Sequence, residues 1–196
     1  MKNVMMLLAI ALVLAIVCIL VLTAVPERQK KTDLEELPED TLDGYVKDSS
    51  DKNAPKKIES GEIERFSLTF STLSWADEEY FHEGIYSLEA ENKDGKVYVI
   101  CNFDPYDGQR ETKEYKTDIL FLRHLDELVK KYDLASHNGR SVFVSGLPDM
   151  YGEKIDILYK SGENIYAVDN QDGFVGRDCI YEVYRLFCEY DESLVD

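Results

Sequence analysis

KIDILYKSGENIYAVD, residues 154–169, is the most informative stretch of the chain for its fold. Two runs rich in β-branched and aromatic residues flank Ser161-Gly162, which predicts a β-hairpin with a two-residue turn. In that register Ile157 lies opposite Tyr166 on the face that we predict to be buried, and opposite charges meet at both ends of the other face. A shift of one residue would expose the aromatic side chains, so the pattern favours this register.

Further strand patterns precede this hairpin. Apolar and polar residues alternate over 62–72, which predicts a strand with one buried face. Residues 85–91 and 96–103 are β-branched and aromatic, and the turn between them ends in Gly95, so they predict a second hairpin. A short apolar run over 141–146 predicts one more strand.

Two segments carry the periodicity of helices. Over 111–134 apolar residues recur at spacings of three and four, with glutamates near the start and lysines near the end. A similar stripe over 177–190 predicts a final helix. The element order is therefore β-β-β-α-β-β-β-α. It predicts an α+β fold, in which an antiparallel sheet has two helices packed on one face.

The chain begins with an apolar run. Val4 to Val25 contains no charged side chain, and as a helix these residues would span about 33 Å, enough to cross the hydrocarbon core of a bilayer. We predict one transmembrane helix within an anchor of residues 1–25. A cleaved signal peptide is the alternative, although the run is long for one and its small-residue cleavage site is imperfect.

The orientation of this anchor depends on the charges beside it. Arg28, Lys30 and Lys31 follow the apolar run and favour a cytoplasmic C-terminal domain. A very short leading tail with Lys2 is typical of an export signal-anchor and favours the opposite side. We expect a single-pass membrane protein whose C-terminal domain lies outside the cytoplasm.

Charge and composition divide the remaining chain into two parts. Residues 26–58 are rich in Lys, Glu and Asp and lack a sustained apolar period, so we predict a disordered charged linker. Residues 59–196 are long enough for one globular domain. This domain carries most of the formal net charge of −17, which would repel a phosphate backbone. We therefore expect no nucleic-acid partner.

Two acidic loops are candidates for a cation site. Asp104 and Asp107 lie in one loop and Asp169 and Asp172 in the other, each loop with a nearby glycine. Carboxylate and carbonyl oxygens are the ligands that calcium prefers, so a calcium-binding domain or a divalent-cation-dependent enzyme is the alternative function. Neither loop has EF-hand spacing, and ordinary turns are the simpler interpretation. We expect no other cofactor.

The cysteines fit no recognised framework. Cys101 falls in a predicted strand, whereas Cys179 and Cys188 fall in the final predicted helix. Their number and spacing match neither a zinc site nor a disulfide scaffold. One bridge from Cys101 to either helical cysteine stays open if that helix packs on the sheet. Buried thiols are the alternative.

Aromatic residues gather around the connection after the first strand. Trp75, Tyr80, Phe81 and Tyr86 belong to this group, and they suit either core packing or an exposed patch for a protein or carbohydrate partner. The chain contains no recognisable catalytic motif. An anchor, a linker and such a domain predict a membrane-tethered, non-enzymatic binding or accessory domain.

Overall fold

The computed structural model describes residues 44–76, 80–147, 151–171 and 173–189. Its strands are β1 (Val46–Asp48), β2 (Ile63–Ser71), β3 (Gly84–Lys93), β4 (Lys96–Pro105), β5 (Glu111–Thr117), β6 (Ser141–Val144), β7 (Glu153–Tyr159) and β8 (Asn164–Asp169). Its helices are α2 (Ile119–Lys131), the short 3-10 helix η2 (Leu134–His137) and α3 (Arg177–Glu189).

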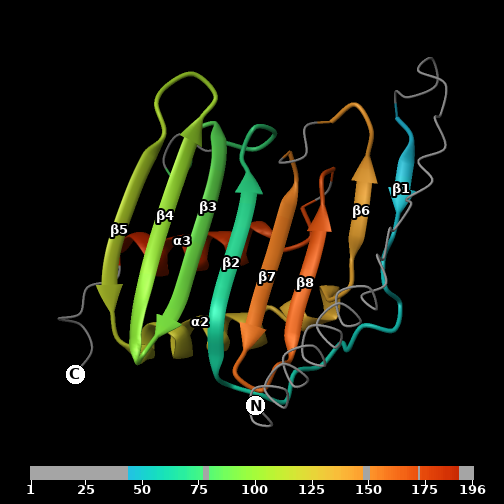
Figure 1. Cartoon of the computed structure of the whole chain (residues 1–196). Coiled ribbons are helices and arrows are strands. Elements are labelled where there is room, and N and C mark those ends of the chain that lie inside the picture. Colours follow the sequence, from blue (N-terminus) through green and yellow to red (C-terminus); the bar gives the residue numbers. More distant parts are fainter. Residues whose placement is uncertain (1–43, 77–79, 148–150, 172, 190–196) are drawn as a thin grey trace, which may run out of the picture. The chain divides into compact units, whose positions relative to one another are not determined.

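The strands form one eight-stranded sheet in the order β1-β6-β8-β7-β2-β3-β4-β5 (Figure 1). Neighbours are antiparallel except β6 and β8, which run parallel, so the sheet is mixed and the prediction of a purely antiparallel sheet was wrong at this point. The reason is that β6 follows helices α2 and η2, which carry the chain across the sheet before β6 adds beyond β8.

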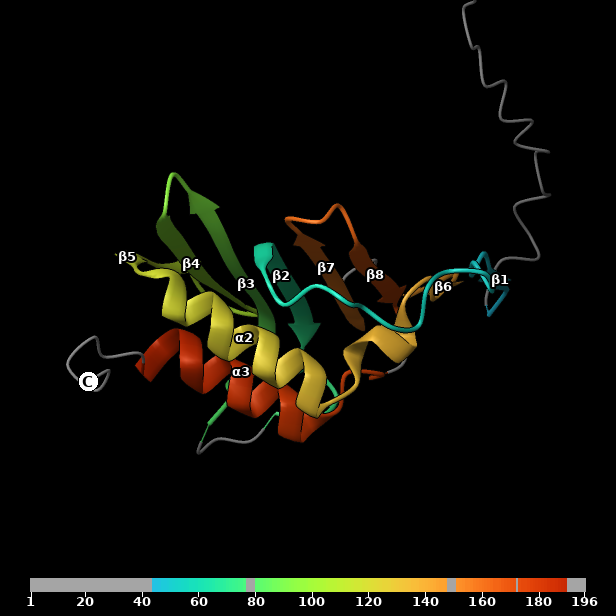
Figure 2. The ribbon, with the colours of Figure 1, turned by 90° about the horizontal axis from the view of Figure 1, so that it is seen from below.

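Helices α2 and α3 lie side by side on the same face of the sheet (Figure 2), which confirms the predicted α+β arrangement. The core lies between these two layers. It contains alternate side chains of β2, such as Phe66, Leu68 and Phe70, together with Leu125 of α2 and Phe187 of α3, all at most 1 % exposed. Burial of these apolar surfaces is the main source of stability for such a two-layer fold.

The β7–β8 hairpin forms where the sequence predicts it, but its turn and register differ. The backbone N–H of Tyr159 donates to Glu163 O at 2.9 Å, so the loop has three residues, 160–162, instead of two. Gly162 supplies the left-handed φ of +87° that such a loop requires at its last position. Ile157 consequently pairs with Ile165. Tyr166, predicted to be buried, is 39 % exposed.

The long helix predicted over 111–134 is wrong in its first part. Residues Glu111–Thr117 form β5, which pairs with β4, and α2 starts after Asp118, whose side chain accepts a hydrogen bond from Leu120 N. Tyr115 fits both a strand and a helix pattern, because residues four positions apart lie on the same face in either structure. Its hydroxyl donates to Phe187 O at 2.8 Å, so β5 contacts the end of α3.

Residues 44–58, which the sequence analysis placed in a disordered linker, are part of the folded domain. β1 pairs with β6, and Asp51 N donates to Gly139 O at 2.8 Å. The predicted membrane anchor, Val4 to Val25, lies outside the described residues. Within the ranges that the structure describes, no helix has the length and apolar character of a membrane span.

Candidate functional site

A hollow of about 660 Å³ lies where the connection between β2 and β3 meets the start of α3. We call it the aromatic hollow. Its lining comprises Trp75, Ala76, Tyr80, Phe81, Arg177, Asp178 and Tyr181. The first four belong to the β2–β3 connection and the other three to the first two turns of α3, so its walls come from segments about 100 residues apart in sequence.

Thr72 holds the two ends of the β2–β3 connection together. Its hydroxyl donates to His82 O at 2.6 Å and accepts from Gly84 N at 3.0 Å, and the residue is fully buried. A Cβ atom at Gly84 would lie 2.5 Å from Asp104 O, so glycine is needed where the connection returns to the sheet. The connection that lines the hollow is therefore attached to the sheet at both of its ends.

The aromatic rings differ in how far they are buried. Phe81 and Tyr86 are each 3 % exposed and belong to the core, which raises the pKa of the Tyr86 hydroxyl to about 12 through desolvation. Trp75 packs edge-on against Phe81 at 5.4 Å between ring centroids. Tyr80 is 46 % exposed and packs edge-on against Tyr181 at 4.8 Å, so an aromatic surface faces solvent at the rim.

Arg177 brings charge to this aromatic surface. Its guanidinium lies over the Trp75 ring, 5.2 Å from the ring centroid. A guanidinium stacked in this way keeps donors in its own plane for a ligand. Asp178, the next residue, adds carboxylate oxygens to the same lining. Donors and acceptors therefore stand beside aromatic rings in one hollow.

A second hollow of about 330 Å³ adjoins the first and shares Trp75 and Arg177 with it. We call it the polar hollow. Its other lining residues are Ser71, Ser74, Tyr151, Gly152, Glu153, Gln171, Gly173 and Gly176. Glu153 is 6 % exposed and accepts a hydrogen bond from Val175 N, so its carboxylate is fixed by the loop before α3. Trp75 and Arg177 thus form a wall between an aromatic and a polar compartment.

The acidic candidates from the sequence lie elsewhere. Asp169 is 1 % exposed, and its carboxylate accepts hydrogen bonds from the Arg140 guanidinium and from Gln171 N. Asp104 pairs with Arg110 at 2.8 Å, and Asp107 lies in the exposed loop after β4. Asp172 lies outside the described residues. Among the residues that the structure does describe, no three acidic, histidine or cysteine side chains group as metal ligands.

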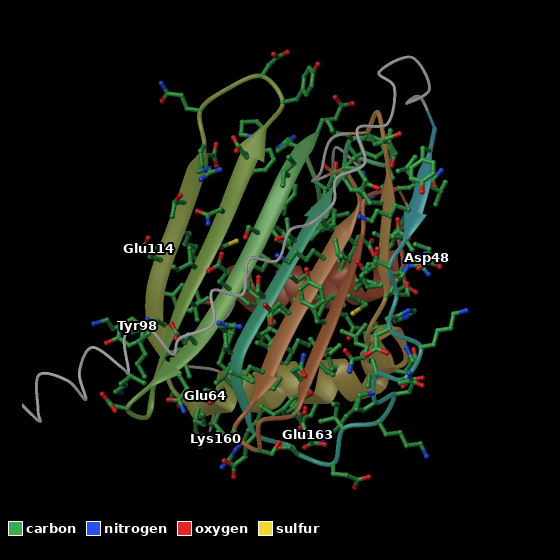
Figure 3. All side chains as sticks on the ribbon, turned by 45° about the vertical axis from the view of Figure 1, so that its right-hand side comes forward. Asp48, Glu64, Tyr98, Glu114, Lys160 and Glu163 are labelled. Carbon is green, nitrogen blue, oxygen red and sulfur yellow. The ribbon has the colours of Figure 1, made fainter. Side chains whose placement is uncertain are left out.

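A third concave area lies on the open face of the sheet, opposite the helices, with a volume of about 370 Å³. Tyr98 of β4 and Glu114 of β5 contribute to it and are labelled in Figure 3. Some of its charged side chains already have partners: Lys93 pairs with Glu91 at 2.6 Å, and Arg65 pairs with Asp156, outside the lining, at 3.3 Å. All its lining residues belong to β2, β3, β4 and β5, whereas the two adjoining hollows bring the β2–β3 connection together with the start of α3.

Trp75 and Tyr80 are recognisable in the sequence as contact residues, whereas Arg177, Asp178 and Tyr181 are not. In α3 these three lie away from the stripe of Ile180, Val183 and Phe187 that faces the core, so periodicity alone classifies them as surface residues. Their position beside Trp75 depends on how α3 packs across the sheet, which no local pattern reports.

Comparisons with known proteins do not assign this site. No protein-family model, no curated protein and no solved structure matches the chain.

Proposed function

We propose that this chain is a membrane-tethered, non-enzymatic binding domain that takes a neutral saccharide into the aromatic and polar hollows. The observation that carries the proposal is the wall formed by Trp75 and Arg177, with aromatic rings on one side and fixed polar groups on the other.

A sugar ring has apolar C–H faces and hydroxyl groups at its edge. Aromatic rings such as the exposed Tyr80 and the partly buried Tyr181 can pack against the C–H faces, because the ring face carries partial negative charge. Each hydroxyl both donates and accepts, so it is satisfied best where donors and acceptors stand together. Arg177 supplies donors, and Asp178 and Glu153 supply acceptors.

Charge favours a neutral ligand over an anionic one. The chain carries a formal net charge of −17, and two carboxylates, those of Asp178 and Glu153, lie at the hollows themselves. A phosphorylated or polyanionic ligand would be repelled by this field. The alternative of a divalent-cation enzyme gains no support from Asp104 and Asp169, since each pairs with an arginine.

The tether is the apolar segment Val4 to Val25. We propose that it spans the membrane and places the domain outside the cytoplasm, where saccharides of the cell surface are accessible. The full chain should then stay with membranes after washing with salt and alkali. A soluble mature protein whose first residue lies near Val25 would instead identify the segment as a cleaved signal.

The ligand proposal is tested by measuring binding of the full chain, in detergent, to a panel of neutral oligosaccharides. Tyr80→Ala should weaken binding about tenfold or more, or roughly 1.4 kcal/mol, because it removes an exposed ring from the hollow. Tyr106→Ala is the matched control, since Tyr106 is 75 % exposed in the β4–β5 loop. Equal affinity of both variants, or no binding to any oligosaccharide, would contradict the proposal.

A further inference from the structure

Two cysteines from distant parts of the chain meet between the sheet and α3. Cys101 lies in β4 and Cys188 in the last turn of α3, and their sulfur atoms are 3.6 Å apart. Cys101 is 8 % exposed, and Cys188 is partly exposed. The structure thus selects one of the two pairings that the sequence left open, and Cys179 is not part of it.

β5 holds the end of α3 in this position. Lys113 Nζ donates to Cys188 O and Tyr115 Oη donates to Phe187 O, each at 2.8 Å. These bonds satisfy two of the last carbonyl groups of the helix, which have no partner within the helix. The backbone that carries Cys188 is therefore fixed against the same sheet that carries Cys101.

We propose that Cys101 and Cys188 form a disulfide bond when the domain meets a disulfide oxidant, which links the end of α3 covalently to β4. A disulfide sulfur–sulfur bond is about 2.05 Å long, so the two sulfur atoms must approach by roughly 1.5 Å. Side-chain rotation in the last turn of a helix is the simplest way to provide such an approach.

The reaction is a thiol–disulfide exchange in two steps. Cys188 is the more exposed thiol, and its thiolate attacks one sulfur of the oxidant, breaking the oxidant's disulfide and releasing one thiol. Cys101 then attacks the sulfur of Cys188 and releases the second thiol. Two protein thiols are oxidised, one disulfide is reduced, and the two protons of the cysteines pass to the released thiolates.

The exposure and the pKa of each thiol determine the order of these steps. The pKa of the Cys101 thiol is raised well above its usual value, first by its hydrogen bond with Cys188 and then by burial. Burial likewise raises the pKa of Cys179 to about 12, and that thiol is fully buried. An oxidant therefore reaches Cys188 first, and Cys179 stays reduced.

The test maps the linkage in the full chain, in membranes treated with oxidised glutathione and then alkylated. Trypsin separates the three cysteines of residues 59–196 into peptides 97–110, 178–185 and 186–196, which contain Cys101, Cys179 and Cys188 respectively; the fourth cysteine, Cys18, falls in another peptide. We expect 97–110 linked to 186–196, and 178–185 alkylated. Separate alkylation of Cys101 and Cys188, or a bond to Cys179, would overturn the proposal.

A second measurement does not depend on mapping. Oxidation should raise the midpoint of thermal unfolding of the full chain, since the bond closes a long loop in the unfolded state, and dithiothreitol should reverse the rise. The rise should be lost in Cys188→Ser and kept in Cys179→Ala. A midpoint that does not rise on oxidation of the native chain would also overturn the proposal.

Discussion

At the scale of single residues, neighbours in β8 have opposite environments. Ile165 is fully buried and pairs with Ile157, whereas Tyr166 is 39 % exposed, with Lys154 Nζ 5.7 Å from its ring centroid. Gly162 determines which of the two faces the core, because its position in the turn sets the register of the whole strand.

We therefore expect Ile165→Ala to reduce the free energy of unfolding by about 2–5 kcal/mol, as for other buried aliphatic residues. Tyr166→Ala should cost roughly 1 kcal/mol or less, because Tyr166 lies on the face of β8 opposite the core and is 39 % exposed. Urea unfolding of both variants measures the difference. A larger loss of stability for Tyr166→Ala than for Ile165→Ala would favour the two-residue turn expected from the sequence.

His137 gives the domain a sensitivity to mild acid. Burial against Phe174 lowers the pKa of its imidazole below the ordinary value of 6.5, with Arg140 and Lys56 acting in the same direction and Asp133 opposing them. At a pH between the two pKa values, His137 binds a proton in the unfolded chain but not in the folded chain. The free energy of unfolding should fall as the pH drops below about 6.5 and level off below the lowered pKa.

Unfolding measured between pH 8 and pH 5 tests this expectation, with His137→Gln as the comparison. Glutamine removes the titrating group, so the variant should lose less stability than the native chain over this interval. Parallel curves for the two proteins would mean that His137 protonates equally in the folded and unfolded states.

At the scale of elements, patterns that depend on adjacent residues were predicted well. The predicted β3–β4 hairpin is confirmed, although its turn has two residues instead of the four between the expected strands, because Asp94 and Gly95 both adopt the positive φ that a two-residue turn requires. β5 was missed because its pattern continues into α2, and the choice of strand depends on the open edge of β4. The parallel partner of β6 is a tertiary feature of the same kind.

The residues of the candidate site also divide into those that the sequence indicates and those that only the fold brings in. Trp75 and Tyr80 stand out in the sequence because aromatic residues are unusual in a connection. Arg177 does not stand out, because its role depends on a distance of 5.2 Å to a ring about 100 residues earlier in the chain. The sequence therefore indicates which residues of one segment could contact a ligand, but it does not predict which two distant segments come together.

Residues 44–58 are bonded to the rest of the domain. Asn138, which is 3 % exposed, donates to Pro55 O at 3.0 Å and to Asn164 O at 2.9 Å, so its side chain links the segment before Ile58 to β8. A soluble fragment starting at residue 44 should be more stable than one starting at residue 59, by roughly 2 kcal/mol or more, because the shorter fragment loses the bond from Asn138 to Pro55 O and the pairing of β1 with β6.

Thermal or urea unfolding of the two fragments, side by side, measures this difference. Asn138→Ala in the longer fragment should reproduce part of the loss, whereas Asn164→Ala, which changes an exposed side chain, should have little effect. Equal stability of the two fragments would mean that residues 44–58 do not stabilise the domain and act as a linker.

At the scale of the whole molecule, the side of the membrane on which the domain lies limits which ligands it meets. The loop between β4 and β5 is a suitable reporter, since Tyr106 is 75 % exposed and the insertion would lie between two paired strands. A protease recognition sequence inserted after Tyr106 should be cut by protease added outside intact cells. Cutting that requires broken cells would place the domain in the cytoplasm.

The position of β2 in the centre of the sheet has a consequence for the order in which the domain folds. β2 to β5 are neighbours both in sequence and in the sheet, whereas the contact of Phe66 with Ile157 joins residues about 90 positions apart. Contacts at such separations close large loops and form slowly. Trp75 lies on the early side of this boundary and Arg177 on the late side, so during synthesis the wall between the hollows is completed only after the last helix has emerged from the ribosome.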